Sequence, residues 1–234
     1  MTVERISKSE TTRERILETA LALFAEKGFA HTTMREIARE ADCSLGLAYR
    51  YFATKDAMVL ALYERLVAEF AEEVRALPPG PLAQRWSLAT RGDIARLEAH
   101  RGALMGLISA GLAPSRATQV LGGATAPVRH KMLALFLEMV TAAKDAPKAE
   151  FSEALAILFY ALHLLLVFVW LQDPTPGHKT TQALIDFGEE MLGHLRLLLR
   201  LPWAGRALTR LAEILAPLLH GSISFDAETD SNPS

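Results

Sequence analysis

Hydroxyl and cationic side chains are concentrated in one short segment near the amino end, residues 32–56, TTMREIAREADCSLGLAYRYFATKD. Thr33 and Glu36 have the spacing of a capping box, which marks the start of a helix, and Ser44 can cap a second helix. Free backbone amides at the start of a helix bind phosphate oxygens. Lys55 lies in the first turn of a third helix, where the helix dipole disfavours a cation unless an anion shares the site. The pattern therefore predicts contacts with nucleic-acid phosphates, and removing Lys55 should lower the slope of the salt dependence by about one.

Two short helices separated by a tight break must position these groups. We expect Ala38 to let the two helices approach closely, and an apolar stripe to bury both of them against a preceding helix at 12–27. That stripe consists of Met34, Ile37, Ala48 and Phe52. The arrangement is a helix-turn-helix, whose second helix enters the major groove. Taken singly, Lys55 is better explained as a solvated surface lysine and Tyr49 as a core aromatic. The expected groove-facing residues are Ser44, Leu45, Leu47, Tyr49 and Arg50.

The segment resembles the TetR/AcrR family of bacterial repressors over about the first sixty residues. It matches that family's motif at Thr33, Ile37, Ala38, Ala41, Ser44, Gly46, Tyr49, Tyr51, Phe52 and Lys55. The family's first helix is matched at Ile16, Leu17, Ala20, Phe24, Gly28 and Phe29. The resemblance implies DNA-backbone contacts from Thr33, Ser44, Tyr49, Tyr51 and Lys55, to which the helix-start argument adds Arg35. It implies positions near the base edges for Leu45, Gly46, Leu47 and Arg50.

Three positions depart from the family motif. Asp42 stands where a glycine is usual, and aspartate tolerates the left-handed conformation of a turn better than most residues. Leu45 replaces a common lysine or arginine, and Leu47 replaces a common hydroxyl residue. We therefore expect base recognition to depend on thymine methyl groups and on Arg50, which can bond guanine.

The rest of the chain consists of helical patterns divided by glycine and proline, and it shows no strand pattern. The expected helices cover 54–78, 82–99, 102–112, 127–144, 148–171 and 179–201, with a final helix after Pro202. The predicted fold is all-α, with an N-terminal three-helix helix-turn-helix domain joined by a long helix to a C-terminal helical domain. The predicted divisions are a flexible arm (1–10), the DNA-binding domain (11–56), a ligand-binding and dimerisation domain (57–220) and a disordered tail (221–234).

One stretch has the composition of a membrane span. Residues 154–171 are 18 residues without a formal charge, at the lower limit of length for a span. Glu150 and Glu153 precede the stretch and Asp173 follows it, with no nearby arginine to set an orientation. We interpret it as a helix buried between its own domain and a partner, with a true span as the alternative.

The family resemblance implies a dimer and a ligand cavity in the C-terminal domain. Helices 148–171 and 179–201 would pair with those of a second subunit, the alternative being burial within a monomer. The second helix carries two apolar stripes, Leu184, Phe187, Met191, Leu195, Leu198 and Ile185, Leu192, Leu199. His163 could orient a polar ligand group or be satisfied internally. The candidate cavity residues, each of which could equally belong to the core, are Trp86, Met105, Met132, Phe136, Met139, Phe159 and His163.

Composition limits the remaining function classes. The net charge of −2 means that DNA binding must come from a local patch. Cys43 is the single cysteine, so the chain has no internal disulfide, and we expect a cytoplasmic protein without a signal peptide. No hydrolase, phosphate-loop or metalloprotease motif is present, and the seven histidines show no metal-binding spacing. We expect no enzyme activity, cofactor, metal or membrane partner.

The predicted function is therefore a ligand-responsive transcriptional regulator. It would bind double-stranded DNA at a palindromic operator as a homodimer, and a small apolar effector would release it. A helical carrier of a lipid or other hydrophobic molecule, without DNA activity, is the alternative.

Overall fold

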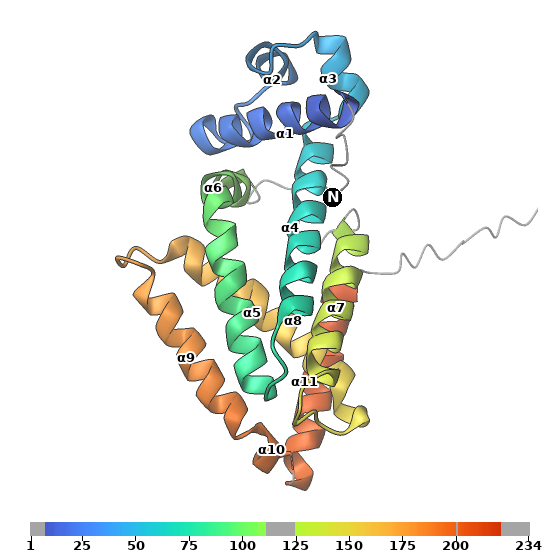
Figure 1. The fold of residues 1–234 in the computed structure, drawn as a ribbon, viewed down its shortest axis with the longest axis vertical. Coiled ribbons are helices and arrows are strands. Elements are labelled where there is room, and N and C mark those ends of the chain that lie inside the picture. Colours follow the sequence, from blue (N-terminus) through green and yellow to red (C-terminus); the bar gives the residue numbers. More distant parts are fainter. Residues whose placement is uncertain (1–7, 111–124, 200, 221–234) are drawn as a thin grey trace, which may run out of the picture.

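The computed structural model describes residues 8–110, 125–199 and 201–220, and these residues form helices without any strand. Figure 1 shows α1 (Lys8–Lys27), α2 (Met34–Glu40) and α3 (Leu45–Tyr51) gathered at one end of an elongated molecule. The long helix α4 (Lys55–Ala76) runs from this end into a larger helical bundle. The predicted all-α fold is confirmed.

Local signals in the sequence set the helix-turn-helix. Gly28 ends α1 with a φ of 80°, a conformation that glycine adopts without steric cost. Thr33 caps α2 through the predicted capping box, and the Ser44 side chain accepts a hydrogen bond from Leu47 N at the start of α3. Asp42 adopts a φ of 47° in the turn between these helices, as its replacement of a glycine required.

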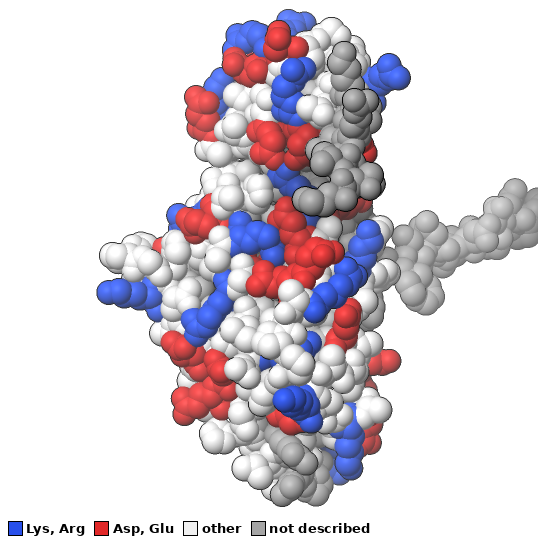
Figure 2. Space-filling view, viewed as in Figure 1, with Lys and Arg blue, Asp and Glu red and all other residues white. Residues whose placement is uncertain are grey.

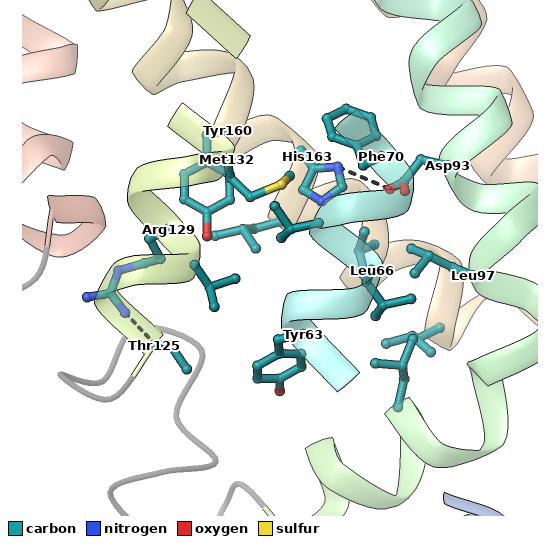
Figure 3. A pocket seen from close by; sticks show the side chains of 16 residues that line it. Tyr63, Leu66, Phe70, Asp93, Leu97, Thr125, Arg129, Met132, Tyr160 and His163 are labelled. Carbon is teal, nitrogen blue, oxygen red and sulfur yellow. Dashed lines mark hydrogen bonds and ion pairs between the residues drawn. The ribbon is translucent and has the colours of Figure 1, made fainter. Parts of the chain in front are cut away.

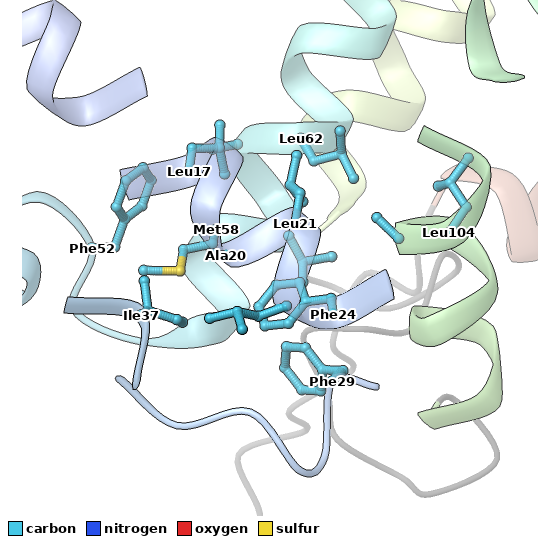
Figure 4. Packing of buried hydrophobic residues seen from close by; sticks show 14 of the residues in the cluster. Leu17, Ala20, Leu21, Phe24, Phe29, Ile37, Phe52, Met58, Leu62 and Leu104 are labelled. Carbon is cyan, nitrogen blue, oxygen red and sulfur yellow. The ribbon is translucent and has the colours of Figure 1, made fainter. Parts of the chain in front are cut away.

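An apolar core fixes the three short helices to one another and to the first turns of α4. Ile37, Ala48 and Phe52 are buried against Phe24 of α1 and Met58 of α4 (Figure 4). Truncating one of these larger side chains to alanine would cost about 2–5 kcal/mol, because the surrounding helices cannot collapse fully into the space. The predicted apolar stripe is confirmed, and α4 belongs to the same packed unit.

The larger bundle contains the remaining helices. Helix α8 packs against α7 and α11, and α9 packs against α5. Asp173 orders the connection between α8 and α9, because its carboxylate accepts hydrogen bonds from the backbone N–H and hydroxyl groups of Thr175 and Thr181. The elements are α5 (Leu82–Leu97), a 3-10 turn η1 (Glu98–His100), α6 (Arg101–Ala110), α7 (Ala126–Thr141), α8 (Ala149–Gln172), α9 (Lys179–Gly193), α10 (Leu195–Leu198) and α11 (Pro202–His220).

Some predicted boundaries were wrong. Helix α1 begins at Lys8, so residues 8–10 of the predicted arm are helical, and residues 1–7 lie outside the described part of the chain. The predicted helix 179–201 is interrupted, because α9 ends at Gly193, whose low helix propensity favours a break. The last two residues of the predicted helix 102–112 and the predicted tail also lie outside the described residues.

Helix α8 contains the uncharged stretch. Within the described residues it is the one helix long and apolar enough to cross a membrane, and 44% of its most apolar 18-residue stretch is buried. It packs between α7 and α11, but Leu165 and Phe168 near its end are 57% and 52% exposed. The helix therefore has a core face and an exposed apolar face.

The helix-turn-helix shares its core with the larger bundle. Leu97 of α5, Leu104 of α6 and Leu171 of α8 belong to the same buried cluster as α1 to α3. Helix α6 crosses α1 so closely that a Cβ added to Gly102 would lie 2.8 Å from Ala25 Cβ. A displacement of α6 toward α1 must therefore displace α1 as well.

Candidate nucleic-acid interface and ligand cavity

Helix α3 presents one face to solvent. Leu45 is 36% exposed and Tyr49 is 48% exposed, and Gly46 and Arg50 lie on the same exposed side. Leu47 is half-buried at the edge of this face. The exposure of Tyr49 excludes the core role that was the alternative for it. A two-turn helix with a large aromatic and an arginine in solvent has the shape and chemistry for a groove.

The two hydroxyl groups that cap α2 and α3 differ in whether the hydroxyl proton is available to a DNA phosphate. Thr33 Oγ1 accepts a hydrogen bond from Glu36 N at 3.2 Å and donates to Glu36 Oε2 at 2.9 Å. The backbone and hydroxyl hydrogen bonds from Thr33 lower the pKa of Glu36, so this box persists at neutral pH. Ser44 Oγ accepts from Leu47 N at 3.1 Å, which leaves its proton for a phosphate oxygen.

Lys55 has another role in this structure. Its Nζ donates to the backbone carbonyls of Phe29 at 2.5 Å and Thr32 at 2.6 Å. The ammonium also lies 4.4 Å from the centroid of the Phe29 ring. Burial lowers the pKa of Lys55, opposed by Asp56 and Glu36. The cation in the first turn of α4 is therefore accounted for by carbonyl groups of the α1–α2 connection, without an anion.

The two other cationic or aromatic candidates are placed differently. Tyr51 is half-buried against the core, and its Oη lies 3.1 Å from Ser9 Oγ of α1, within hydrogen-bond distance. Arg35 is exposed in the first turn of α2. Of the predicted phosphate contacts, Arg35, Ser44 and Tyr49 have accessible polar groups, whereas the polar groups of Tyr51 and Lys55 already have hydrogen-bond partners within the protein.

The helix-turn-helix end is electrically mixed. Residues 8–56 carry eight basic and eight acidic side chains, and Figure 2 shows both signs interspersed at this end. Glu14 and Glu18 of α1 pair with Arg65 of α4. Any binding of DNA must therefore depend on individual positions, not on a uniformly basic face.

A cavity of about 140 Å³ lies among α4, α5, α7 and α8 (Figure 3). Its wall is mostly apolar, and it reaches the end of α8 at Leu171 and the middle of α6 at Leu104. Both leucines also belong to the helix-turn-helix core. The lining residues are Tyr63, Leu66, Val67, Phe70, Asp93, Leu97, Leu104, Thr125, Val128, Arg129, Met132, Tyr160, His163, Leu164, Val167 and Leu171.

Polar groups lie at two ends of this cavity. At one end His163 Nδ1 lies 3.6 Å from Asp93 Oδ2, and Arg96 donates to the other carboxylate oxygen. Burial, helped by the charge of Arg96, lowers the pKa of His163 to about 4, and burial raises the pKa of Asp93 to about 7 against the effect of Arg96. At the other end Arg129 donates from Nε to the Leu219 carbonyl and from Nη1 to Thr125 Oγ1.

Comparison with known proteins identifies the amino-terminal part. Residues 16–62 match the family model for bacterial regulatory proteins of the tetR family. This segment contains the capping box, the left-handed Asp42 and the exposed face of α3. The chain carries a TetR-family helix-turn-helix domain.

The curated relatives match only a short stretch of this chain. YerO of Bacillus subtilis (strain 168), an uncharacterised helix-turn-helix-type transcriptional regulator, is 48% identical over 52 residues, 22% of this chain and 18% of YerO. The transcriptional regulator HbdR of Aromatoleum sp. (strain CIB) is 37% identical over 65 residues, 28% of each chain. The chain thus spans under a third of the length of these relatives.

The fold is shared over a greater length. A tetR-family regulator from Streptomyces coelicolor superposes with a TM-score of 0.59 at 20% identity, over 88% of this chain and 90% of that one. The helical bundle that follows the helix-turn-helix therefore shares its overall fold with that protein.

The cavity brings together only two of the seven predicted ligand residues, Met132 and His163. Met105 is partly buried against the helix-turn-helix core. The other four are buried in the second core cluster and do not line this cavity: Trp86, Phe136, Met139 and Phe159.

The sequence-based prediction did not include the α4 wall of the cavity, which supplies Tyr63 and Phe70, because it placed the ligand site in the helices after Leu82. It also missed Asp93, although a signal was present. Asp93 interrupts the apolar stripe of α5 four residues after Ala89 and four before Leu97, and a carboxylate on a buried face indicates a polar site. Among the described residues, no group of three or more potential ligands could hold a metal ion.

Proposed function

We propose that the chain is a ligand-responsive transcriptional repressor in the bacterial cytoplasm. It binds a palindromic operator as a homodimer and leaves it when a small, mostly apolar effector fills the cavity. The single observation that supports DNA binding best is the exposed face of α3, carrying Tyr49 and Arg50, within a segment that matches the TetR-family model. The DNA-binding part corresponds to the proposed residues 11–56, and the ligand and dimer functions to 57–220.

The residues on this surface divide into two roles. We assign DNA contact to Arg35, Ser44, Leu45, Gly46, Leu47, Tyr49 and Arg50, which lie on or beside the exposed faces of α2 and α3. We assign positioning to Thr33, Tyr51 and Lys55, because their polar groups already bind within the protein. Positioning matters for affinity because α3 can fit a groove only when the loop between α1 and α2 holds it in place.

Exposed apolar residues support the dimer. Leu184, Phe187 and Met191 form a stripe along α9 with exposures of 40%, 57% and 42%, while Ile185 on the opposite side is fully buried. Leu165 of α8 is exposed as well. Large apolar side chains in solvent at helical spacing are typical of a covered interface, and two-fold pairing would supply the cover.

The shared core provides a route from effector to DNA. Leu97, Leu104 and Leu171 touch both the cavity and the cluster that packs on α1. A ligand that favours a different placement of α6 would move α1 and hence α3. In a dimer the two α3 helices must match successive major grooves, about 34 Å apart, so a small rotation lowers affinity.

A mobility-shift titration tests the proposal. Full-length protein is titrated onto duplexes from the intergenic regions flanking its own gene, beside a folded Tyr49→Ala/Arg50→Ala variant. We expect a salt-sensitive complex with one fragment that contains an inverted repeat, and its loss in the variant. A protein that binds hydrophobic molecules but no fragment at low salt would instead be a carrier, and the regulator proposal would be wrong.

A further inference from the structure

The cavity has one end whose chemistry is specific. The His163 ring lies among the rings of Phe70, Phe136 and Tyr160, at centroid distances of 5.8, 5.7 and 6.3 Å. Only 13% of its side-chain surface is accessible, and His163 is part of the cavity wall. Figure 3 shows one ring nitrogen facing Asp93 and the other directed into the cavity. A ligand in the cavity would therefore meet His163 Nε2.

The Asp93 carboxylate determines which nitrogen of the His163 ring carries the proton. Burial keeps His163 neutral at neutral pH, since its pKa is lowered to about 4. Asp93 Oδ2 lies 3.6 Å from Nδ1, too far for a hydrogen bond but close enough for its charge to favour a proton on Nδ1. Burial raises the pKa of Asp93 to about 7, although Arg96 hydrogen-bonds the carboxylate and favours its ionised form, so Asp93 carries its negative charge above that pH, including at pH 8. In this tautomer Nε2 carries a lone pair and accepts hydrogen bonds.

Among the described residues, no side chain hydrogen-bonds to His163 Nε2. An acceptor in an apolar cavity favours a ligand that donates a hydrogen bond and carries no charge. A carboxylate has no proton to donate, and moving a charge into this wall is costly. The guanidinium of Arg129 does not offset that cost at this end, because Figure 3 shows it turned toward Thr125, away from His163.

We propose that the effector is an uncharged molecule with an apolar body and one hydroxyl group, best a phenol, which donates a hydrogen bond to His163 Nε2. The cavity has a volume of about 140 Å³ and a mostly apolar wall. A cavity of this size accepts a single benzene ring, so the apolar part of the effector that enters it is about one ring in size. The inference rests on the proposed function and names the ligand class of the same cavity.

Calorimetric titration of the purified full-length chain at pH 8, without DNA, tests the inference. The probes are p-cresol, 4-methylanisole, toluene and p-toluate, which share a ring and differ in the polar group. We expect p-cresol to bind about tenfold more tightly than toluene or 4-methylanisole, the factor that one hydrogen bond supplies. Equal binding of p-cresol and toluene, no binding of p-cresol, or tightest binding of p-toluate would overturn the inference.

Two variants locate the contact. His163→Phe keeps an aromatic ring among its neighbours and should reduce the preference for p-cresol over toluene to about one. Tyr160→Phe is the matched control, since it removes a nearby cavity hydroxyl, and it should keep the preference. A preference that survives in the first variant or vanishes in the second would contradict the assignment to Nε2. The comparison of probes on the unmodified chain stands even where a variant fails to fold.

The outcome is separable from the test of DNA binding. A chain that binds an operator but does not prefer p-cresol would refute the ligand class alone. A chain that prefers p-cresol and binds no operator would refute the regulator proposal and leave the cavity assignment intact.

Discussion

Replacing Lys55 with methionine distinguishes a role in holding the α1–α2 connection from direct contact with a DNA phosphate. Methionine keeps the apolar stem but removes the ammonium that donates to the Phe29 and Thr32 carbonyls. A hydrogen bond to a charged group contributes about 1.5–3 kcal/mol when buried, and a cation–π contact about 0.5–1 kcal/mol. Because the ammonium is only partly buried, hydrogen bonds to water can replace some of this stabilisation in the variant. We expect Lys55→Met to lower the free energy of unfolding by about 2 kcal/mol.

Urea unfolding followed by circular dichroism measures the loss in the free energy of unfolding. The salt dependence of operator binding shows whether Lys55 contacts a DNA phosphate. A lost phosphate contact lowers the slope of log K against log salt by about one. We expect Lys55→Met to leave that slope unchanged. Arg35→Met, at an exposed first-turn cation, should lower the slope by about one and change stability by less than about 0.5 kcal/mol. Unchanged stability with a reduced slope in Lys55→Met would refute the positioning role.

Three further predictions concern the groove face, the dimer and the cavity. Arg50→Ala should weaken operator binding by about 1–3 kcal/mol in an anisotropy titration and relax selectivity at one base pair, while binding to unrelated DNA changes little. Phe187→Glu should convert the dimer to a monomer in analytical ultracentrifugation, because it places a charge in the exposed α9 stripe. His163→Phe should remove part of the acid sensitivity of folding. The unfolded histidine takes up a proton near pH 6.5 and the folded one only near 4, so stability falls as the pH drops through this window, by at most about 3 kcal/mol.

Matched controls make these outcomes decisive. Arg39 pairs with Glu40 on the surface of α2, so Arg39→Ala should leave operator selectivity intact. Leu88 of α5 is 39% exposed outside α8 and α9, so Leu88→Glu should not dissociate the dimer. A Phe187→Glu dimer of normal affinity would contradict the proposed interface. Equal acid sensitivity of His163→Phe and the unmodified chain would contradict the buried neutral histidine.

The helix-turn-helix was predictable because its signals are local. The Thr33–Glu36 box, the Ser44 cap and the left-handed Asp42 each act within a few residues, so their spacing in the sequence is their spacing in space. The same holds for Gly28 at the end of α1. The two apolar stripes of residues 179–201 were also anticipated, although the break at Gly193 was not.

The partners of Lys55 and the cavity wall were not predictable, because they depend on tertiary packing. The carbonyls of Phe29 and Thr32 lie 26 and 23 residues earlier in the chain and reach Lys55 only when the loop folds back on α4. Helical periodicity shows that Trp86 and Phe70 are both buried, but not which of them faces an open space. That choice depends on how α4 and α7 are placed, which no single helix specifies.

The proposed function requires that the α3 face recognise a two-fold symmetric DNA sequence. Selection of bound duplexes from a library with a randomised central segment, followed by sequencing, tests it most directly. We predict enrichment of one inverted repeat with half-sites about 10–10.5 base pairs apart, or a multiple of that spacing. Failure to enrich any sequence, with retention that does not respond to salt, would contradict the claim.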